Sequence, residues 1–255
     1  MFSRRIRVLA PRDIDANKYS HGVVGVIAGS DEYPGAGLLC VGGARRGGAG
    51  YINYLMTEKR VADLVIGSYP DVVLLADVNE SKANAWVVGP GAPKLPKRFA
   101  LPATKFLVLD AGAVNMAAKS KAEFTVITPH EGEFKALGYE VSGPSDRIPL
   151  ALKAARELGV FVLLKGYNTV IATPGGLSLV ESSGGSELAT AGTGDILAGF
   201  IGSMLASWNP DNEGAVLEVL IKSARAHAFA GKRAYRAKRS LVATDLLDAL
   251  ARVVL

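Results

Sequence analysis

Short runs of almost uninterrupted apolar residues constrain the fold of this chain more than any other feature of its sequence. The strand-like runs are Val23–Ala28, Tyr51–Met56, Trp86–Val88, Phe106–Leu109, Phe124–Ile127 and Val160–Leu164. Most of them end in Gly, Pro, Asp or Thr, which are residues that interrupt strands. Strands that are apolar on both faces are typical of a parallel sheet covered by helices on both sides.

Helical spacing of apolar residues lies between and after these runs. It predicts helices over Leu38–Arg46, Glu58–Ile66, Pro149–Leu158, Gly194–Trp208, Ala215–Tyr235 and Thr244–Val254. A short antiparallel pair is predicted at Asn168–Val170 and Leu177–Glu181, joined by a turn at Pro174-Gly175-Gly176. Three prolines between Gly91 and Lys105 leave little room for a crossover helix, so an extended or one-turn connection is predicted there. We therefore predict one mostly parallel α/β domain over residues 1–255, with helices on both faces of its central sheet.

Composition excludes several classes of protein. Hydrophobic residues make up 49% and charged residues 21% of the chain, which argues against long disordered stretches. The single cysteine, Cys40, rules out an internal disulfide framework and fits a reducing compartment. The longest uncharged apolar stretch, Ile196–Trp208, is too short to span a bilayer, and no apolar region follows the basic N-terminal residues. We therefore expect a cytoplasmic protein with no membrane partner.

The strongest chemical signal is Gly192-Thr193-Gly194-Asp195, which is followed at once by apolar residues of helical spacing. Glycines allow backbone N–H groups to converge on one point, and the following helix adds its free N-terminal amides and the positive end of its dipole. The combination predicts an anion site suited to phosphate. From the spacing alone, Asp195 is interpreted equally well as a helix cap and as a functional carboxylate.

Polar residues also follow the other predicted strands. Lys165 comes directly after one strand, His130 and Glu133 after another, and Asp110 after a third. Taken singly, Lys165 is a lysine at a strand end, His130 a loop histidine and Glu133 a first-turn acid favoured by a helix dipole. The carboxyl ends of parallel strands meet at one edge of a sheet, where such sheets bind ligands. We therefore expect these residues to contribute to one site.

In chain order, these blocks resemble the NAD(P)H-hydrate dehydratases, the repair-enzyme branch of the ribokinase-like superfamily. The matching blocks are Ala28-Gly29-Ser30 with Tyr33-Pro34-Gly35-Ala36, Gly89-Pro90-Gly91, Leu109-Asp110-Ala111, Thr128–Glu133, Lys165–Thr169 and Gly192–Asp195. The resemblance runs from about Arg12 to Asp245. The block ending at Asp195 would by itself indicate only the superfamily. The blocks around Tyr33 and His130 narrow the resemblance to this branch of the superfamily.

The resemblance implies a lyase that removes water from the (S)-hydrate of NADH or NADPH. ADP is the expected co-substrate, with ATP as the alternative, and the products of ADP are AMP and phosphate. The nucleotide would phosphorylate the ring hydroxyl of the hydrate, and phosphate would then leave to restore the dihydropyridine. Asp195 would be the base near that hydroxyl and Gly192–Gly194 the anion hole. Phosphoryl transfer requires little more from a protein than positioning of the reactants, charge neutralisation and a proton acceptor.

The resemblance also implies the binding residues. The hydrate pocket would be lined by Ala36, Gly91, His130 and Asp195. The nucleotide would be held by Lys165, Gly166, Tyr167, Asn168, Thr169, Gly185, Ser186, Glu187, Leu188, Ala189, Thr190, Ala191, Gly192, Thr193 and Gly194. Glu133 stands where related kinases keep a glutamate that orients a hydrated Mg²⁺.

The chain departs from the family pattern in four places. Pro93 replaces a further glycine, the segment 92–104 is shorter than usual, Asn17-Lys18 replaces a His-Lys pair, and Ala191 replaces a frequent glycine. No hydrate-epimerase domain precedes the dehydratase region, so epimerisation is not expected of this chain. Family members are commonly oligomeric, and the glycine-rich segment Gly35–Gly50 predicts close helix packing. We therefore expect a homo-oligomer, specifically a homotetramer.

Two other functions compete with the dehydratase. A ribokinase-like kinase of a small alcohol or vitamin precursor is disfavoured by His130, because such kinases more often carry Asn there. A non-enzymatic nucleotide- or nucleic-acid-binding module is disfavoured by Asp195. The net charge of +5 suits anionic small substrates as well as nucleic acid. The basic stretch Lys232–Arg239 has no accompanying nucleic-acid motif and is interpreted as a solvated helix end, so no nucleic-acid partner is expected.

Overall fold

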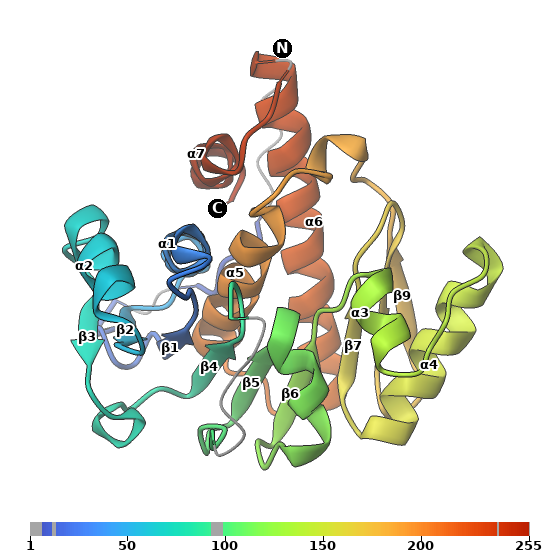
Figure 1. The fold of residues 1–255 in the computed structure, drawn as a ribbon, viewed down its shortest axis with the longest axis horizontal. Coiled ribbons are helices and arrows are strands. Elements are labelled where there is room, and N and C mark those ends of the chain that lie inside the picture. The colour runs from blue at the N-terminus through green and yellow to red at the C-terminus, as the bar shows by residue number, and fades with distance from the viewer. Residues whose placement is uncertain (1–6, 12–13, 93–98, 239, 255) are drawn as a thin grey trace.

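A nine-stranded sheet organises the chain in the computed structural model, which describes residues 7–11, 14–92, 99–238 and 240–254 (Figure 1). The strands are β1 (Val23–Ile27), β2 (Tyr51–Leu55), β3 (Val73–Leu75), β4 (Ala85–Val88), β5 (Phe106–Leu109), β6 (Phe124–Ile127), β7 (Phe161–Leu164), β8 (Thr169–Ala172) and β9 (Ser178–Glu181). Their order is β3-β2-β1-β4-β5-β6-β7-β8-β9. Strands β1 to β7 are parallel, and β8 and β9 are antiparallel to their neighbours.

Both faces of the sheet are buried, as the apolar runs predicted. In β5, Phe106 and Val108 point into one hydrophobic cluster, whereas Leu107 and Leu109 point into the other. Successive side chains of a strand point to opposite faces, so a strand between two helical layers must be apolar throughout. The prediction of a mostly parallel α/β fold with helices on both faces is confirmed.

The described helices divide between the two faces of the sheet (Figure 1). The first face carries α1 (Pro34–Ala44), α2 (Lys59–Ser68), α5 (Thr193–Trp208), α6 (Glu213–Lys238) and α7 (Ala243–Val253). The second carries α3 (Glu131–Ala136), α4 (Arg147–Leu158) and the 3₁₀ helix η2 (Ala111–Lys119). Single 3₁₀ turns are η1 (Val78–Glu80), η3 (Pro144–Asp146) and η4 (Ser186–Leu188).

Besides the single 3₁₀ turns, the described elements that were not predicted from the sequence are β3, α3 and η2. Strand β3 has three residues and α3 has six, so neither is long enough for apolar periodicity to show. Segment η2 is a 3₁₀ helix, whose spacing differs from the 3.6-residue period. Between Gly91 and Lys105, residues 93–98 lie outside the described part of the chain, so Pro93 does too, and residues 99–104 contain no helix.

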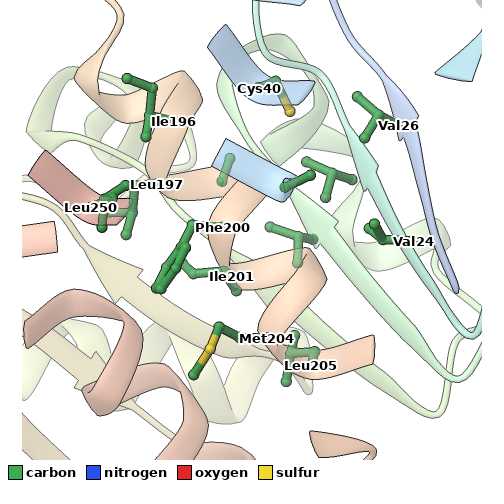
Figure 2. Packing of buried hydrophobic residues seen from close by; sticks show 14 of the residues in the cluster. Val24, Val26, Cys40, Ile196, Leu197, Phe200, Ile201, Met204, Leu205 and Leu250 are labelled. Carbon is green, nitrogen blue, oxygen red and sulfur yellow. The ribbon is translucent and has the colours of Figure 1, made fainter. Parts of the chain in front are cut away.

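Helices α1 and α5 approach each other backbone to backbone. A Cβ atom added to Gly43 would lie 2.1 Å from the carbonyl oxygen of Ile196, and one added to Gly199 would lie 1.9 Å from that of Cys40. Figure 2 shows α5 side chains from Ile196 to Leu205 in the cluster that also holds Cys40 of α1. The close packing predicted for Gly35–Gly50 therefore occurs within this chain, and the segment is no argument for a subunit interface.

Replacing Gly199 with alanine is expected to lower the free energy of unfolding by about 1–3 kcal/mol or more, because the new methyl group collides with the α1 backbone. The matched control is Gly67→Ala in α2, where an added Cβ meets nothing within 4 Å. Its better helix propensity should stabilise the protein by up to about 1 kcal/mol. Urea unfolding followed by circular dichroism measures both variants. Equal stabilities would contradict the close approach of α1 and α5.

Among the described residues, no helix combines the length and apolar character needed to cross a bilayer. Cys40 is fully buried between α1 and α5, so it is a core residue, as expected from its apolar surroundings in the sequence.

Candidate active site

The carboxyl ends of β5, β6 and β7 bring three charged side chains together. Lys165 Nζ lies 2.8 Å from Asp110 Oδ1 and 3.8 Å from Glu133 Oε2. Asp110 also accepts a hydrogen bond of 2.7 Å from Thr128 Oγ1, and its side chain is only 3% exposed. Burial opposes the charge on Lys165, but the carboxylates of Asp110 and Glu133 outweigh it and raise its pKa above the usual value. Lys165 is therefore a largely buried, charged residue rather than a solvated lysine at a strand end.

The N-terminus of α5 faces this cluster. Its N-cap residue is Gly192, which has a positive φ of 90° and leaves no room for a side chain, since an added Cβ would lie 2.4 Å from Leu39 Cδ1. A Cβ added to Gly194 would lie 3.5 Å from Lys165 Nζ, so the ammonium group stands beside the first turn of α5. The helix dipole and the lysine thus place positive charge at the same point.

Asp195 lies in the same first turn and is partly buried. Burial, together with the negative charges of Asp110 and Glu133, raises the pKa of its carboxyl group to about 7, although Lys165 partly offsets these effects. The N-cap position belongs to Gly192, and within the described residues no hydrogen bond reaches the Asp195 carboxylate. The helix-cap interpretation of Asp195 is therefore wrong. A carboxyl group that titrates near neutral pH is suited to accept a proton.

His130 and Glu133 form a capping box at the start of α3. His130 Nδ1 accepts hydrogen bonds from the N–H groups of Gly132 (3.0 Å) and Glu133 (3.2 Å), and Glu133 Oε2 accepts one of 2.9 Å from the His130 N–H. The structural interpretation of both residues therefore holds, and the second nitrogen of the His130 ring, Nε2, lies 3.5 Å from Glu133 Oε1.

A cavity of about 480 Å³ opens beside Lys165 and the first turn of α5. Its volume lies in the range of about 300–1,000 Å³ that is usual for small-molecule sites. The residues predicted to bind nucleotide that line it are Lys165, Gly166, Tyr167, Thr169, Gly185, Ser186, Leu188, Ala189, Thr193 and Gly194. Those outside its lining are Asn168, Glu187, Thr190, Ala191 and Gly192. Most of the predicted nucleotide residues are thus brought together around one space.

The residues predicted for the hydrate pocket divide into two places. His130 lines the cavity, whereas Ala36 in the first turn of α1 and Gly91 after β4 lie side by side outside its lining. Gly91 has a positive φ of 66°, and a Cβ added to it would lie 2.3 Å from that of Ala36. The strand order reverses between β1 and β4, which is where open α/β sheets form ligand crevices.

Sequence reasoning missed the walls that β9 and α6 supply to the cavity. The additional lining residues are Glu181, Gly184, Leu197, Ala224, His227 and Ala228. His227 is buried, and its Nε2 lies 2.9 Å from the carbonyl oxygen of Thr193. Burial lowers the pKa of His227 to about 4, so the ring is neutral and holds Thr193 through an N–H donor. The apolar spacing of α6 did not predict this contact. The only available signal was His227 itself, a histidine on the apolar face of the predicted helix.

The described residues contain no cluster of three or more His, Cys, Asp or Glu side chains that could hold a metal ion. Glu133 Oε2 is already hydrogen-bonded to the His130 backbone, and Asp110 is paired with Lys165. Mg²⁺ retains several waters and is commonly held by substrate phosphates with only one or two carboxylates. The donor set therefore fits a phosphate-bound, hydrated Mg²⁺ near Glu133 and not an ion held by protein ligands alone.

A mostly parallel sheet with a glycine-capped helix N-terminus and a cavity at its carboxyl edge defines a ribokinase-like α/β protein, and solved structures of that fold confirm the predicted class. The chain belongs to the NAD(P)H-hydrate dehydratase family, whose sequence model matches residues 24–252. It is 32% identical over 261 residues to the ADP-dependent (S)-NAD(P)H-hydrate dehydratase of Bacillus subtilis, with 96% of this chain and 93% of the relative covered. The family resemblance predicted from the motif blocks is thereby confirmed.

Two further comparisons complete the placement. A bifunctional NAD(P)H-hydrate repair enzyme of Mycobacterium tuberculosis is 40% identical over 220 residues, which cover 82% of this chain and 45% of the relative. The chain thus spans about half the length of the first curated relatives it matches. The crystal structure of the ADP/ATP-dependent NAD(P)H-hydrate dehydratase from Bacillus subtilis, co-crystallised with ATP and Mg²⁺, matches with a TM-score of 0.80 at 29% identity and covers 96% of this chain and 93% of that one.

Proposed function

We propose that this chain is an ADP-dependent (S)-NAD(P)H-hydrate dehydratase, a lyase that restores NADH or NADPH from the hydrate and converts ADP to AMP and phosphate. The observation that carries the proposal is Asp195, a carboxyl group with a pKa of about 7 in the first turn of α5. Lys165 and a nucleotide-sized cavity lie beside it. Family membership and the name of the Bacillus subtilis relative support the same activity.

The chemistry follows from the placement of these groups. The α5 amides and Lys165 bind the terminal phosphate and offset the charge that develops on it. Asp195 accepts the proton of the ring hydroxyl while the hydroxyl oxygen bonds to the terminal phosphorus and AMP leaves. Phosphate then departs with the electron pair of its carbon–oxygen bond, and loss of a ring proton restores the dihydropyridine. A hydrated Mg²⁺, with its waters oriented by Glu133, would supply further charge neutralisation at the phosphates.

The two substrates occupy different parts of the edge in this proposal. The nucleotide lies in the cavity lined by Lys165–Tyr167 and the first turn of α5. The hydrate lies toward Ala36 and Gly91, where the strand order reverses, with Asp195 between the two. His130 belongs to the nucleotide side of this arrangement, because it lines the same cavity.

The test is to incubate the pure protein with NADH-hydrate, Mg²⁺ and either ADP or ATP. Absorbance in the reduced-nicotinamide band should rise as AMP accumulates, and faster with ADP than with ATP. The same experiment with NADPH-hydrate gives the preference between the two dinucleotides. No rise with either nucleotide overturns the proposal, and phosphorylation of a small alcohol by the same preparation would favour the kinase alternative.

Turnover is expected to rise with pH through a limb centred near 7, because Asp195 must be ionised to accept the hydroxyl proton. Lys165, with its raised pKa, stays charged throughout this range and contributes no limb. Measuring kcat from about pH 5.5 to about pH 9 with saturating substrates tests this expectation. A flat profile, or a rate that falls as pH rises through 7, would contradict the role of Asp195.

Assembly and location remain predictions. We propose a homotetramer, which rests on the family resemblance now that Gly35–Gly50 is accounted for inside the chain, and a cytoplasmic site of action, which fits the single buried Cys40. Light scattering at micromolar concentration should give the mass of four chains, and the mass of one chain would exclude this assembly.

A further inference from the structure

Arg147, the first residue of α4, lies buried behind the nucleotide cavity. Its Nη2 donates to three backbone carbonyls, those of Leu164 (3.2 Å), Lys165 (3.0 Å) and Asn168 (3.3 Å). Its Nη1 forms an ion pair with Glu131, and its side chain is only 10% exposed. One guanidinium group therefore binds both ends of the loop at 165–168, which carries residues that line the cavity.

The direction of these carbonyls determines which way the loop presents its donors. In a trans peptide the C=O and the following N–H point in opposite directions. The Lys165 carbonyl points to Arg147, so the N–H of Gly166 points away from the guanidinium, and Gly166 itself lines the cavity. Within the described residues this N–H has no backbone or side-chain acceptor. It is therefore an unused donor beside Lys165, at the place where a phosphate would bind.

The fit between the loop and Arg147 is tight. A Cβ added to Gly166 would lie 2.5 Å from Arg147 Nη2, so the guanidinium lies directly against the loop backbone. The partner of Nη1, Glu131, directly follows the N-cap residue His130. Arg147 thus joins the segment after β6 to the segment after β7, and both segments contribute to the cavity.

Only an arginine can make this set of contacts. The guanidinium presents donors on a rigid fork, so Nη1 and Nη2 reach partners on different segments at the same time. A lysine at this position would keep the positive charge and most of the side-chain length. Its ammonium group, however, carries all of its N–H donors on one nitrogen atom. It can satisfy the Glu131 carboxylate or the loop carbonyls, but not both.

We propose that Arg147 is a positioning residue for the nucleotide, which holds the loop at 165–168 so that the Gly166 N–H and the Lys165 ammonium face the phosphates. The inference rests on the proposed function for the identity of the nucleotide. A purely structural arginine would affect the amount of folded enzyme, whereas a positioning residue changes the affinity for nucleotide and leaves the hydrate side untouched.

Arg147→Lys is the test, with ADP binding measured by calorimetry and steady-state kinetics on the same folded preparation. The Kd and KM for ADP should rise at least about tenfold, while kcat and the KM for the hydrate stay within about threefold. The matched control is Arg156→Lys on the same helix, whose Nη2 lies over Gly176 in the β8–β9 turn, and it should leave all four constants within about twofold.

An unchanged Kd for ADP in Arg147→Lys, or a lower kcat with both KM values unchanged, overturns the inference. If Arg147→Lys does not fold, Gly166→Ala replaces it, because the new methyl group pushes the guanidinium off the carbonyls. It should raise the Kd for ADP by the same order, and an unchanged Kd again overturns the inference.

The binding experiment separates this inference from the proposed function. A parent protein that binds ADP but does not dehydrate the hydrate contradicts the proposed function, while the ADP affinity of Arg147→Lys still decides the role of Arg147. A parent protein that binds neither ADP nor ATP contradicts both.

Discussion

Replacing Asp195 with asparagine is expected to lower turnover by at least about two orders of magnitude, because the variant keeps the shape of the side chain and loses the proton acceptor. The stability of the folded protein should not decrease. The pKa of Asp195 is about 7 in the folded protein, above the ordinary 3.8, so its ionisation destabilises the fold progressively from about pH 4 to pH 7 and fully above. At pH 8 the neutral asparagine removes this destabilisation, and the variant should melt at or above the parental temperature.

The measurements are kcat, the melting temperature and the Kd for ADP. Nucleotide affinity should be retained, because the backbone amides of Gly192–Gly194 are untouched. The matched control is Asp63→Asn, which neutralises an exposed carboxylate paired with Lys59 on α2 and should change none of the three quantities. Near-parental turnover in Asp195→Asn would show that another group accepts the proton.

Replacing Lys165 with methionine is expected to impair both stability and activity. Asp110 would remain almost fully buried with its Thr128 hydrogen bond but without its cation, and breaking such a pair costs about 3–5 kcal/mol. The lost positive charge beside the α5 amides should lower turnover by about 10²–10³-fold. Urea unfolding and kcat measure the two effects.

A second substitution separates these effects. Adding Asp110→Asn to Lys165→Met removes the unpaired carboxylate, so most of the lost stability should return while turnover stays low. The control is Lys135→Met, which breaks an exposed ion pair with Glu140 and should cost less than about 1 kcal/mol. Equal losses of stability in Lys135→Met and Lys165→Met would contradict a buried, paired Lys165.

Local sequence was enough to predict most of the strands and the groups at their ends. The apolar runs of β5 and β6 match the predicted bounds, because a strand buried on both faces leaves a continuous apolar signal. The glycines before Asp195 indicated the helix N-terminus that the structure places beside Lys165. The same local signal misjudged Asp195 as a possible cap, since spacing does not show that Gly192 occupies that position.

Other parts of the site depend on contacts between distant segments. Asp110 was noted only as a strand-end residue, yet it pairs with Lys165 across 55 positions of the chain. His227 reaches Thr193 from α6, and Arg147 reaches three carbonyls at and just after the end of β7. Each of these residues sits in a segment whose own pattern is that of an ordinary helix or strand.

The sequence by itself determined the parallel α/β class, the glycine turn before α5 and the family, because each depends on the order and spacing of neighbouring residues. Only the tertiary structure decided that α1 and α5 touch through glycines, that the pKa of Asp195 is raised to about 7, that His227 lines the cavity, and that Arg147 contacts the loop after β7. Burial, charge and close contact depend on which strands and helices become neighbours in space. That arrangement results from the packing of the whole sheet with its helices, so the periodicity of a single segment does not predict it.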